Sequence, residues 1–138
     1  MNVLVQDKFQ EIEHTADKAL EIWGETIDEF FINALAGYYH LLNVKEYPDC
    51  PLEQKIRFAE NSIESLLVIF INEFIFLADQ GMIFPIIDLE IKANSLLCIA
   101  KGFKSNEITN HIKALTYHKL KIEKYDLGDL RSNLVFDV

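Results

Sequence analysis

The sequence predicts a single α+β domain over residues 1–138, with mostly antiparallel β-structure and two main α-helices. Two segments, 26–43 and 61–80, repeat apolar residues at three- and four-residue spacing. Short segments of alternating polarity precede, separate and follow them. Half of the residues are hydrophobic, a quarter are charged, and no Pro-, Gly- or Ser-rich stretch marks a linker, which is typical of one globular domain.

The first third of the chain is predicted to form two strands and a helix. Segments 9–14 and 19–24 alternate between polar and apolar residues. The helix begins at Thr26, because Thr26 and Glu29 form a capping box. In this motif the hydroxyl and the carboxylate each accept a hydrogen bond from an otherwise unpaired N–H group.

In the middle of the chain a strand at 54–59 precedes the second helix, which Asn61 and Glu64 cap in the same way and Gly81 ends. Because this helix is apolar nearly all round, we expect it at the centre of the domain. Its apolar run is shorter than the roughly 20 residues that a membrane span requires, so no membrane contact is expected. Asn72 within it needs a partner, and main-chain groups or a lysine are the candidates.

The last third is predicted to consist of strands. Segments 86–92 and 96–103 flank a short turn and form a hairpin, and 133–138 is the final strand. Between them, after a polar loop at 104–110, residues 112–125 are expected to form one long strand. Apolar and charged residues alternate along its second half, which indicates a strand with one face in solvent.

The charge balance limits the function classes. The chain has 13 Lys and Arg against 22 Asp and Glu, a net charge of −9, and no cluster of basic residues along the sequence. Direct binding to nucleic acid is therefore not expected, and any role in nucleic-acid biology should use a basic protein partner. Cys50 and Cys98 match neither a disulfide framework nor a paired metal motif, and no signal peptide precedes them, so we expect inert thiols and a cytoplasmic location.

One candidate site lies in the turn between the first two predicted strands. His14, Thr15 and Asp17 place a carboxylate and a hydroxyl where both can face one cation, with His14 fixing the loop. The alternative is a local turn whose side chains bond neighbouring main-chain N–H groups.

A second candidate site lies at the end of the chain. Asp137 and the α-carboxylate of Val138 follow an apolar strand, which is electrostatically costly unless a cation or a lysine compensates. Oxygen ligands of this kind suit Ca²⁺, Mg²⁺ or Mn²⁺. The alternative is a solvated, frayed tail.

Lys113 is the third candidate. Alternation places it on the same side of its predicted strand as Leu115, which suggests either a carboxylate partner or a lysine that extends to solvent at a sheet edge. His118, in the same strand, is expected to be a hydrogen-bonded sheet residue rather than a ligand.

Four blocks of the sequence together resemble the archease family. They are the Glu-His-Thr-Ala-Asp block at 13–17 with the strand and helix start that follow, the helix block at 65–74, the Ile-Lys-Ala-Leu-Thr-Tyr-His block at 112–118, and the ending at 134–138. The blocks keep their order and span most of the chain.

The resemblance implies a non-enzymatic partner of the GTP-dependent RNA ligase of tRNA splicing and RNA repair, which speeds guanylylation and keeps the ligase turning over. It implies a site for a divalent cation, Ca²⁺ first and Mg²⁺ or Mn²⁺ next, at Asp17, Asp137 and Val138, with Lys113 also required and His14 facing the partner. The chain departs from the family at Ile69, where an acid is usual, and in its short loop at 104–110.

Two other function classes compete with this interpretation. A general chaperone-like binding module would suppress aggregation of unrelated proteins and would not depend on Asp17. A small metal-dependent hydrolase would use His14 as a base, but no nucleophile or oxyanion donor accompanies that residue in the sequence.

Overall fold

The computed structural model of the protein describes residues 2–4, 8–12, 17–44 and 47–138. The α+β prediction is confirmed, because two helices accompany strands that pair antiparallel in the described sheets. The elements, in chain order, are β1 (Asn2–Val3), β2 (Phe9–Ile12), β3 (Lys18–Gly24), α1 (Ile27–Leu41), β4 (Leu52–Ala59), α2 (Ile63–Asp79), β5 (Met82–Lys92), β6 (Ser95–Lys104), β7 (Ala114–Leu115), β8 (Glu123–Lys124) and β9 (Leu130–Asp137).

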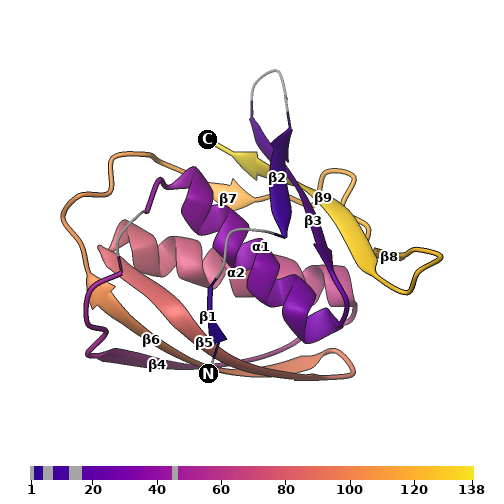
Figure 1. The fold of residues 1–138 in the computed structure, drawn as a ribbon, viewed down its shortest axis with the longest axis horizontal. Helices are drawn as coiled ribbons and strands as arrows, with labels where there is room; N and C mark the ends of the chain where they lie inside the picture. The colour runs from indigo at the N-terminus through magenta and orange to yellow at the C-terminus, as the bar shows by residue number, and fades with distance from the viewer. Residues whose placement is uncertain (1, 5–7, 13–16, 45–46) are drawn as a thin grey trace.

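The strands form two sheets with the helix pair between them (Figure 1). Sheet A has four strands in the order β1-β5-β6-β4, and sheet B has the order β2-β3-β9-β7, with β8 also paired to β9. Helix α1 packs on β3 and β5, and α2 packs on β5 and β7, so both sheets and both helices share one core. The largest buried side chains include Tyr38, Tyr39, Phe30, Phe31, Phe70, Phe74, Phe84 and Phe136.

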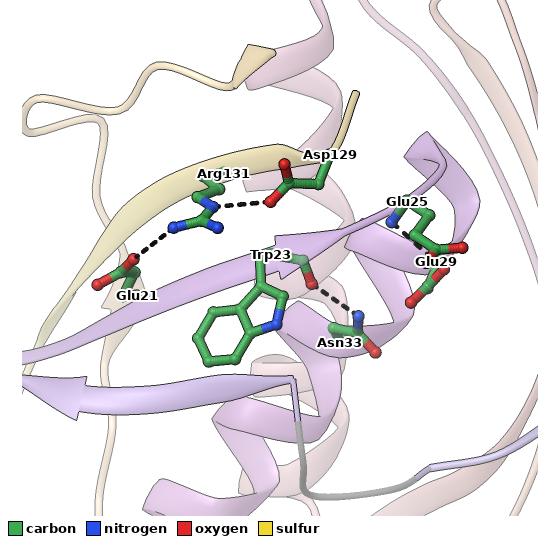
Figure 2. A network of polar contacts seen from close by, with 7 residues as sticks. All are labelled: Glu21, Trp23, Glu25, Glu29, Asn33, Asp129 and Arg131. Carbon is green, nitrogen blue, oxygen red and sulfur yellow. Dashed lines mark hydrogen bonds and ion pairs between the residues drawn. The ribbon is translucent and has the colours of Figure 1, made fainter. Parts of the chain in front are cut away.

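Helix α1 begins where the capping box predicts. Thr26 is the N-cap, and its hydroxyl accepts the N–H of Glu29 at 3.1 Å. The Glu29 carboxylate accepts the N–H of Glu25 at 3.3 Å, one residue earlier than a capping box predicts (Figure 2). The helix ends at Leu41 rather than at Asn43, whose φ of 63° is left-handed and incompatible with further helix.

The capping prediction for α2 is wrong by one residue. Ser62, not Asn61, is the N-cap, and its hydroxyl accepts the N–H of Ser65 at 3.1 Å. Glu64 does not complete a capping box, because its carboxylate accepts the N–H of Ile122 at 3.0 Å. The acid expected to cap the helix therefore attaches a distant segment to it.

Helix α2 lies at the centre of the domain, as predicted, but part of its circumference is open. Nine of its residues are buried, whereas Phe76 is 55% exposed. The helix is closed by Gly81, as expected, which has a φ of 83° and donates its N–H to the carbonyl of Ala78 at 2.8 Å. Among the described helices, none combines the length and apolar character needed to cross a bilayer.

The strand predicted at 112–125 is not continuous. At one end Leu115 lies opposite Phe136 of β9. At the other end Glu123 lies opposite Arg131 on the same edge of β9. From the first pair to the second, β9 covers five residue steps, whereas the segment from Leu115 to Glu123 covers eight. Three residues of that segment therefore have no partner position on β9. These surplus residues leave the sheet as a loop.

Helix α2 holds this segment where the sheet does not. The Asn72 side chain accepts the N–H of Leu115 at 2.8 Å through Oδ1 and donates to the Leu115 carbonyl at 3.3 Å through Nδ2. These groups point away from β9, because Lys113 and Thr116 make the main-chain bonds to β9 on either side. Asn72 therefore takes the place of a further strand at the edge of β7, and the predicted main-chain partner is confirmed.

We expect Asn72→Leu to lower the free energy of unfolding by about 1–3 kcal/mol, because it leaves both main-chain groups of Leu115 without their partner. Urea unfolding followed by circular dichroism measures the effect. Asn106→Leu, the same change at an exposed loop position, should alter stability little and serves as the control. Equal stability of the two variants would show that the edge of β7 needs no partner.

The predicted hairpin is confirmed as β5 and β6, but β5 begins at Met82 rather than at residue 86. Pro85 has no N–H to donate, and a bulge around it shifts the register against β6. The N–H of Phe84 donates to the hydroxyl of buried Tyr39 at 2.9 Å, which ties α1 to sheet A. Burial raises the pKa of Tyr39 well above its ordinary value, so this hydroxyl stays neutral.

Candidate functional site

Three strands of sheet B end at the same point of the molecule. The first residue of β3, Lys18, lies opposite Phe136 of β9. The first residue of β7, Ala114, lies opposite Asp137, the last residue of β9. Figure 1 shows the C-terminal end of β9 beside the ends of β2 and β3. The register thus brings residues from both ends of the sequence together.

The main chain of Asp137 is paired in the sheet rather than frayed. Its carbonyl oxygen accepts the N–H of Lys113 at 2.8 Å, and β9 continues through it. Its side chain is exposed, and the following residue, Val138, is 42% exposed. A carboxylate is therefore presented to solvent from a fixed backbone position.

Asp17 lies at the same end of sheet B. It directly precedes Lys18, the first residue of β3, and Lys18 pairs with Phe136, the neighbour of Asp137 in β9. Asp17 is half-buried. His14 and Thr15, the other members of the predicted turn site, lie outside the described residues.

The oxygen donors at this end of sheet B suit a hard divalent cation. Carboxylates and main-chain oxygens are the ligands that Ca²⁺, Mg²⁺ and Mn²⁺ prefer. Within the described ranges, no three side chains of His, Cys, Asp or Glu gather closely enough to hold a metal. Asp17 and Asp137 could therefore supply only part of the about six to eight oxygens that Ca²⁺ takes, and main-chain, water or partner oxygens would supply the rest.

Lys113 adjoins this site along the main chain, but its side chain leaves the sheet on the other face. Ala114 is the residue opposite Asp137, and successive residues of a strand project to opposite faces. The Lys113 side chain is exposed and lines a hollow of about 520 Å³ with Tyr38 and Asp79. Burial and the Asp79 charge raise the pKa of Tyr38. In the described part of the chain no ion pair involves Lys113.

Helix α2 contributes no carboxylate at position 69. Ile69 is half-buried and packs against the core. The segment 105–113 contains no helix or strand and lines two hollows, of about 520 Å³ and about 710 Å³.

The structure brings Arg131 close to the basic residues of segment 118–121. The loop between β7 and β8 brings His118, Lys119 and Lys121 to the side of sheet B that faces away from the helices, where Arg131 of β9 also lies. These residues line a groove of about 310 Å³. The carboxylates of Glu21 and Glu123 line the same groove, so its charge is mixed. In the sequence, only the alternation of lysines with apolar residues in this segment indicated that Lys119 and Lys121 lie together, since it predicts that they share a face.

Arg131 is fixed by carboxylates on the same face of sheet B (Figure 2). Its Nε donates to Oδ2 of Asp129 at 2.7 Å, and its Nη1 lies 3.9 Å from Oε1 of Glu21 on β3. The guanidinium carbon also lies 4.9 Å from the ring centre of Tyr125. The hydrogen bond lowers the pKa of Asp129 and raises the pKa of Arg131, so both groups are charged at neutral pH.

The two cysteines are free thiols with raised pKa values. Cys98 is buried, and burial raises its pKa to about 12. Burial also raises the pKa of Cys50, whose Sγ donates to the carbonyl of Pro48 at 3.3 Å. Thiolates are the reactive form, so these environments agree with the prediction that both thiols are inert.

The protein is a small α+β domain with two antiparallel sheets around a helix pair. Its candidate site lies where β3 begins and β9 ends. The sequence profile of the Archease protein family matches residues 9–138. The chain belongs to the archease family.

Individual archeases are similar over nearly their whole length. Protein archease of Methanosarcina mazei is 29% identical over 141 residues, which cover 95% of this chain and 96% of the relative. Protein archease of Pyrococcus furiosus is 30% identical, with 95% and 99% covered. The crystal structure of an archease from Thermotoga maritima, described as a possible chaperone, is 30% identical, covers 94% of this chain and 96% of its own, and superposes with a TM-score of 0.67.

Proposed function

We propose that the chain is a non-enzymatic protein cofactor that stimulates guanylylation and multiple turnover of a GTP-dependent RNA ligase in tRNA splicing or RNA repair. Membership of the archease family supports this proposal. The structural observation that carries it is that two acids, Asp17 directly before β3 and Asp137 at the end of β9, lie at one end of sheet B. We call this end, with Val138 and Lys113, the acidic tip.

The acidic tip would hold one divalent cation through Asp17, Asp137 and main-chain oxygens of Val138. Ca²⁺ is the first candidate, with Mg²⁺ and Mn²⁺ as alternatives. When bound, the cation supplies positive charge that orders oxygen ligands of the partner or its nucleotide. The bond from the Lys113 N–H keeps Asp137 in place before binding, so less conformational entropy is lost when the partner docks. The Lys113 ammonium supplies compensating positive charge at the same end of the sheet.

The charge of the chain suits a protein partner. At −9 the molecule is repelled by RNA at long range and attracted by a basic RNA-binding enzyme, which raises the rate of encounter. We therefore propose a cytoplasmic ligase as the partner and the acidic tip as the part that enters near its nucleotide pocket.

The test is guanylylation of the RNA ligase from the same cell, with this protein present in sub-stoichiometric amounts. We expect faster formation of the ligase–GMP adduct and more joined RNA per ligase, because one cofactor molecule serves many ligase molecules. A ligase whose rate does not change at any ratio of the two proteins would contradict the proposal.

A general chaperone-like binding module is the second candidate. The description of the Thermotoga maritima relative as a possible chaperone favours it, as do exposed apolar side chains such as Phe76 and Leu127, at 55% and 95% exposure. This candidate predicts that the chain suppresses aggregation of unrelated heat-denatured proteins and that Asp17→Asn has no effect. Suppression limited to the ligase would count against it.

A further inference from the structure

The groove on sheet B lies on the face that points away from the helices. Its floor includes Ala19 of β3 and Val135 of β9, which are paired in the ladder. Lys119 and Lys121 of the β7–β8 loop line it, and Arg131 lines it from β9. It has a volume of about 310 Å³, room for a small polar group rather than for a folded partner.

The groove exists because of the three surplus residues in the β7–β8 loop. The loop bonds to α2 through the N–H of Ile122, and the side chains of Leu120 and Ile122 pack against the core. Lys119 and Lys121 are exposed and line the groove. Lys119 is in the left-handed region, with φ 51°. The two lysines are therefore set by a loop that is anchored on its inner side.

The two lysines are the basic groups of the groove that remain available to a ligand. Among the described residues neither makes an ion pair, whereas Arg131 is engaged by Asp129 at 2.7 Å. Two carboxylates, of Glu21 and Glu123, also line the groove. Glu21 faces Arg131 at 3.9 Å, which offsets part of its charge. Two exposed ammonium groups without ion pairs suit an anion with several acceptor oxygens.

The position of the groove indicates the chemical class of the anion. Its floor residue Val135 lies two residues before Asp137 in β9, so these two residues share a face, and Ala19 lies two positions after Asp17 in the sequence. We propose that the groove binds a phosphoryl group whose oxygens the two lysines hold, at the end of sheet B where Asp17 and Asp137 would hold a cation. This inference rests on the proposed function. The phosphoryl group belongs either to GTP or to the terminal phosphate of the RNA.

Titration of the whole chain with inorganic pyrophosphate, followed by two-dimensional amide NMR in the presence and absence of CaCl₂, tests the proposal. We expect the amide signals of Lys119 and Lys121 to shift in a saturable manner, and the affinity to rise when Ca²⁺ is present. In Lys119→Ala/Lys121→Ala we expect binding to be roughly tenfold weaker. The control, Lys55→Ala/Arg57→Ala, removes the same charge from exposed positions on β4 of sheet A and should bind as the wild type does.

Pyrophosphate that shifts no groove signals, or that binds the lysine variant and the wild type equally, would overturn the proposal. Parallel titrations with GTP and with a 3′-phosphorylated dinucleotide identify the source, since the physiological ligand should bind more tightly than pyrophosphate. Failure of the proposed function would appear separately, as wild-type protein that binds pyrophosphate in the groove but does not stimulate the ligase.

Discussion

Asp137→Asn is expected to abolish stimulation of the ligase and to weaken Ca²⁺ binding at least roughly tenfold, while the fold remains intact. The amide keeps the size of the side chain but removes the negative charge that a hard cation requires. The fold should persist because the side chain is exposed and the structural bond of this residue is made by its carbonyl oxygen to Lys113. Isothermal titration with CaCl₂ measures the affinity, and ligase–GMP formation measures stimulation.

The matched control is Asp88→Asn, which removes one charge from an exposed side chain on β5 of sheet A. It should equal the wild type in both assays. If Asp137→Asn bound Ca²⁺ and stimulated the ligase normally, the acidic tip would not be the functional site. If Asp17→Asn alone lost both properties, the site would lie at the turn rather than at the end of β9.

Gly102→Ala is expected to cost about 3–5 kcal/mol of unfolding free energy and to lower the melting temperature by roughly 10 °C. A Cβ at this position would overlap the carbonyl oxygen of Ile83 and lie 2.7 Å from Cδ1 of Phe84. The contact is with main chain at the bulge around Pro85, where the carbonyl of Pro85 also accepts the N–H of Leu4 at 3.1 Å. Neither strand can move without breaking its other pairing.

Gly128→Ala separates lack of space from lack of conformational freedom. Gly128 has a φ of 90° in the turn before β9, and no atom lies within 4 Å of the position of its Cβ. Its cost should be limited to the strain of a left-handed residue, about 1–2 kcal/mol. Thermal unfolding of both variants by calorimetry gives the comparison. If the two variants lost equal stability, the clash of a Cβ with the main chain would not be the reason why position 102 requires glycine.

The two helices and the N-cap of α1 were predictable because they depend on near neighbours. Thr26 caps α1 through the N–H of a residue three positions later, a distance that the sequence displays directly. The prediction for α2 failed at Glu64 because the bond made by this carboxylate runs to Ile122, 58 residues away. A local motif carries no information about such a partner.

The β7–β8 segment shows where strand prediction reached its limit. Its alternation correctly indicates that Leu120 and Ile122 turn inward and that the lysines between them turn outward. The alternation cannot show that β9 is three residues too short to pair with all of it. The same surplus residues form the groove, and the alternation predicts that its two lysines share a face but not that Arg131 of β9 lies beside them.

The sequence by itself determined the α+β class, the two helices, the inward and outward faces of the strands and the acids of the candidate site. Each of these follows from residue type and from periodicity over a few positions. Only the tertiary structure decided that Asp17 and Asp137 share one end of sheet B, that Asn72 covers the edge of β7, and that Lys119, Lys121 and Arg131 line one groove. These depend on the register between segments far apart in the chain, and register is set by packing of the whole core.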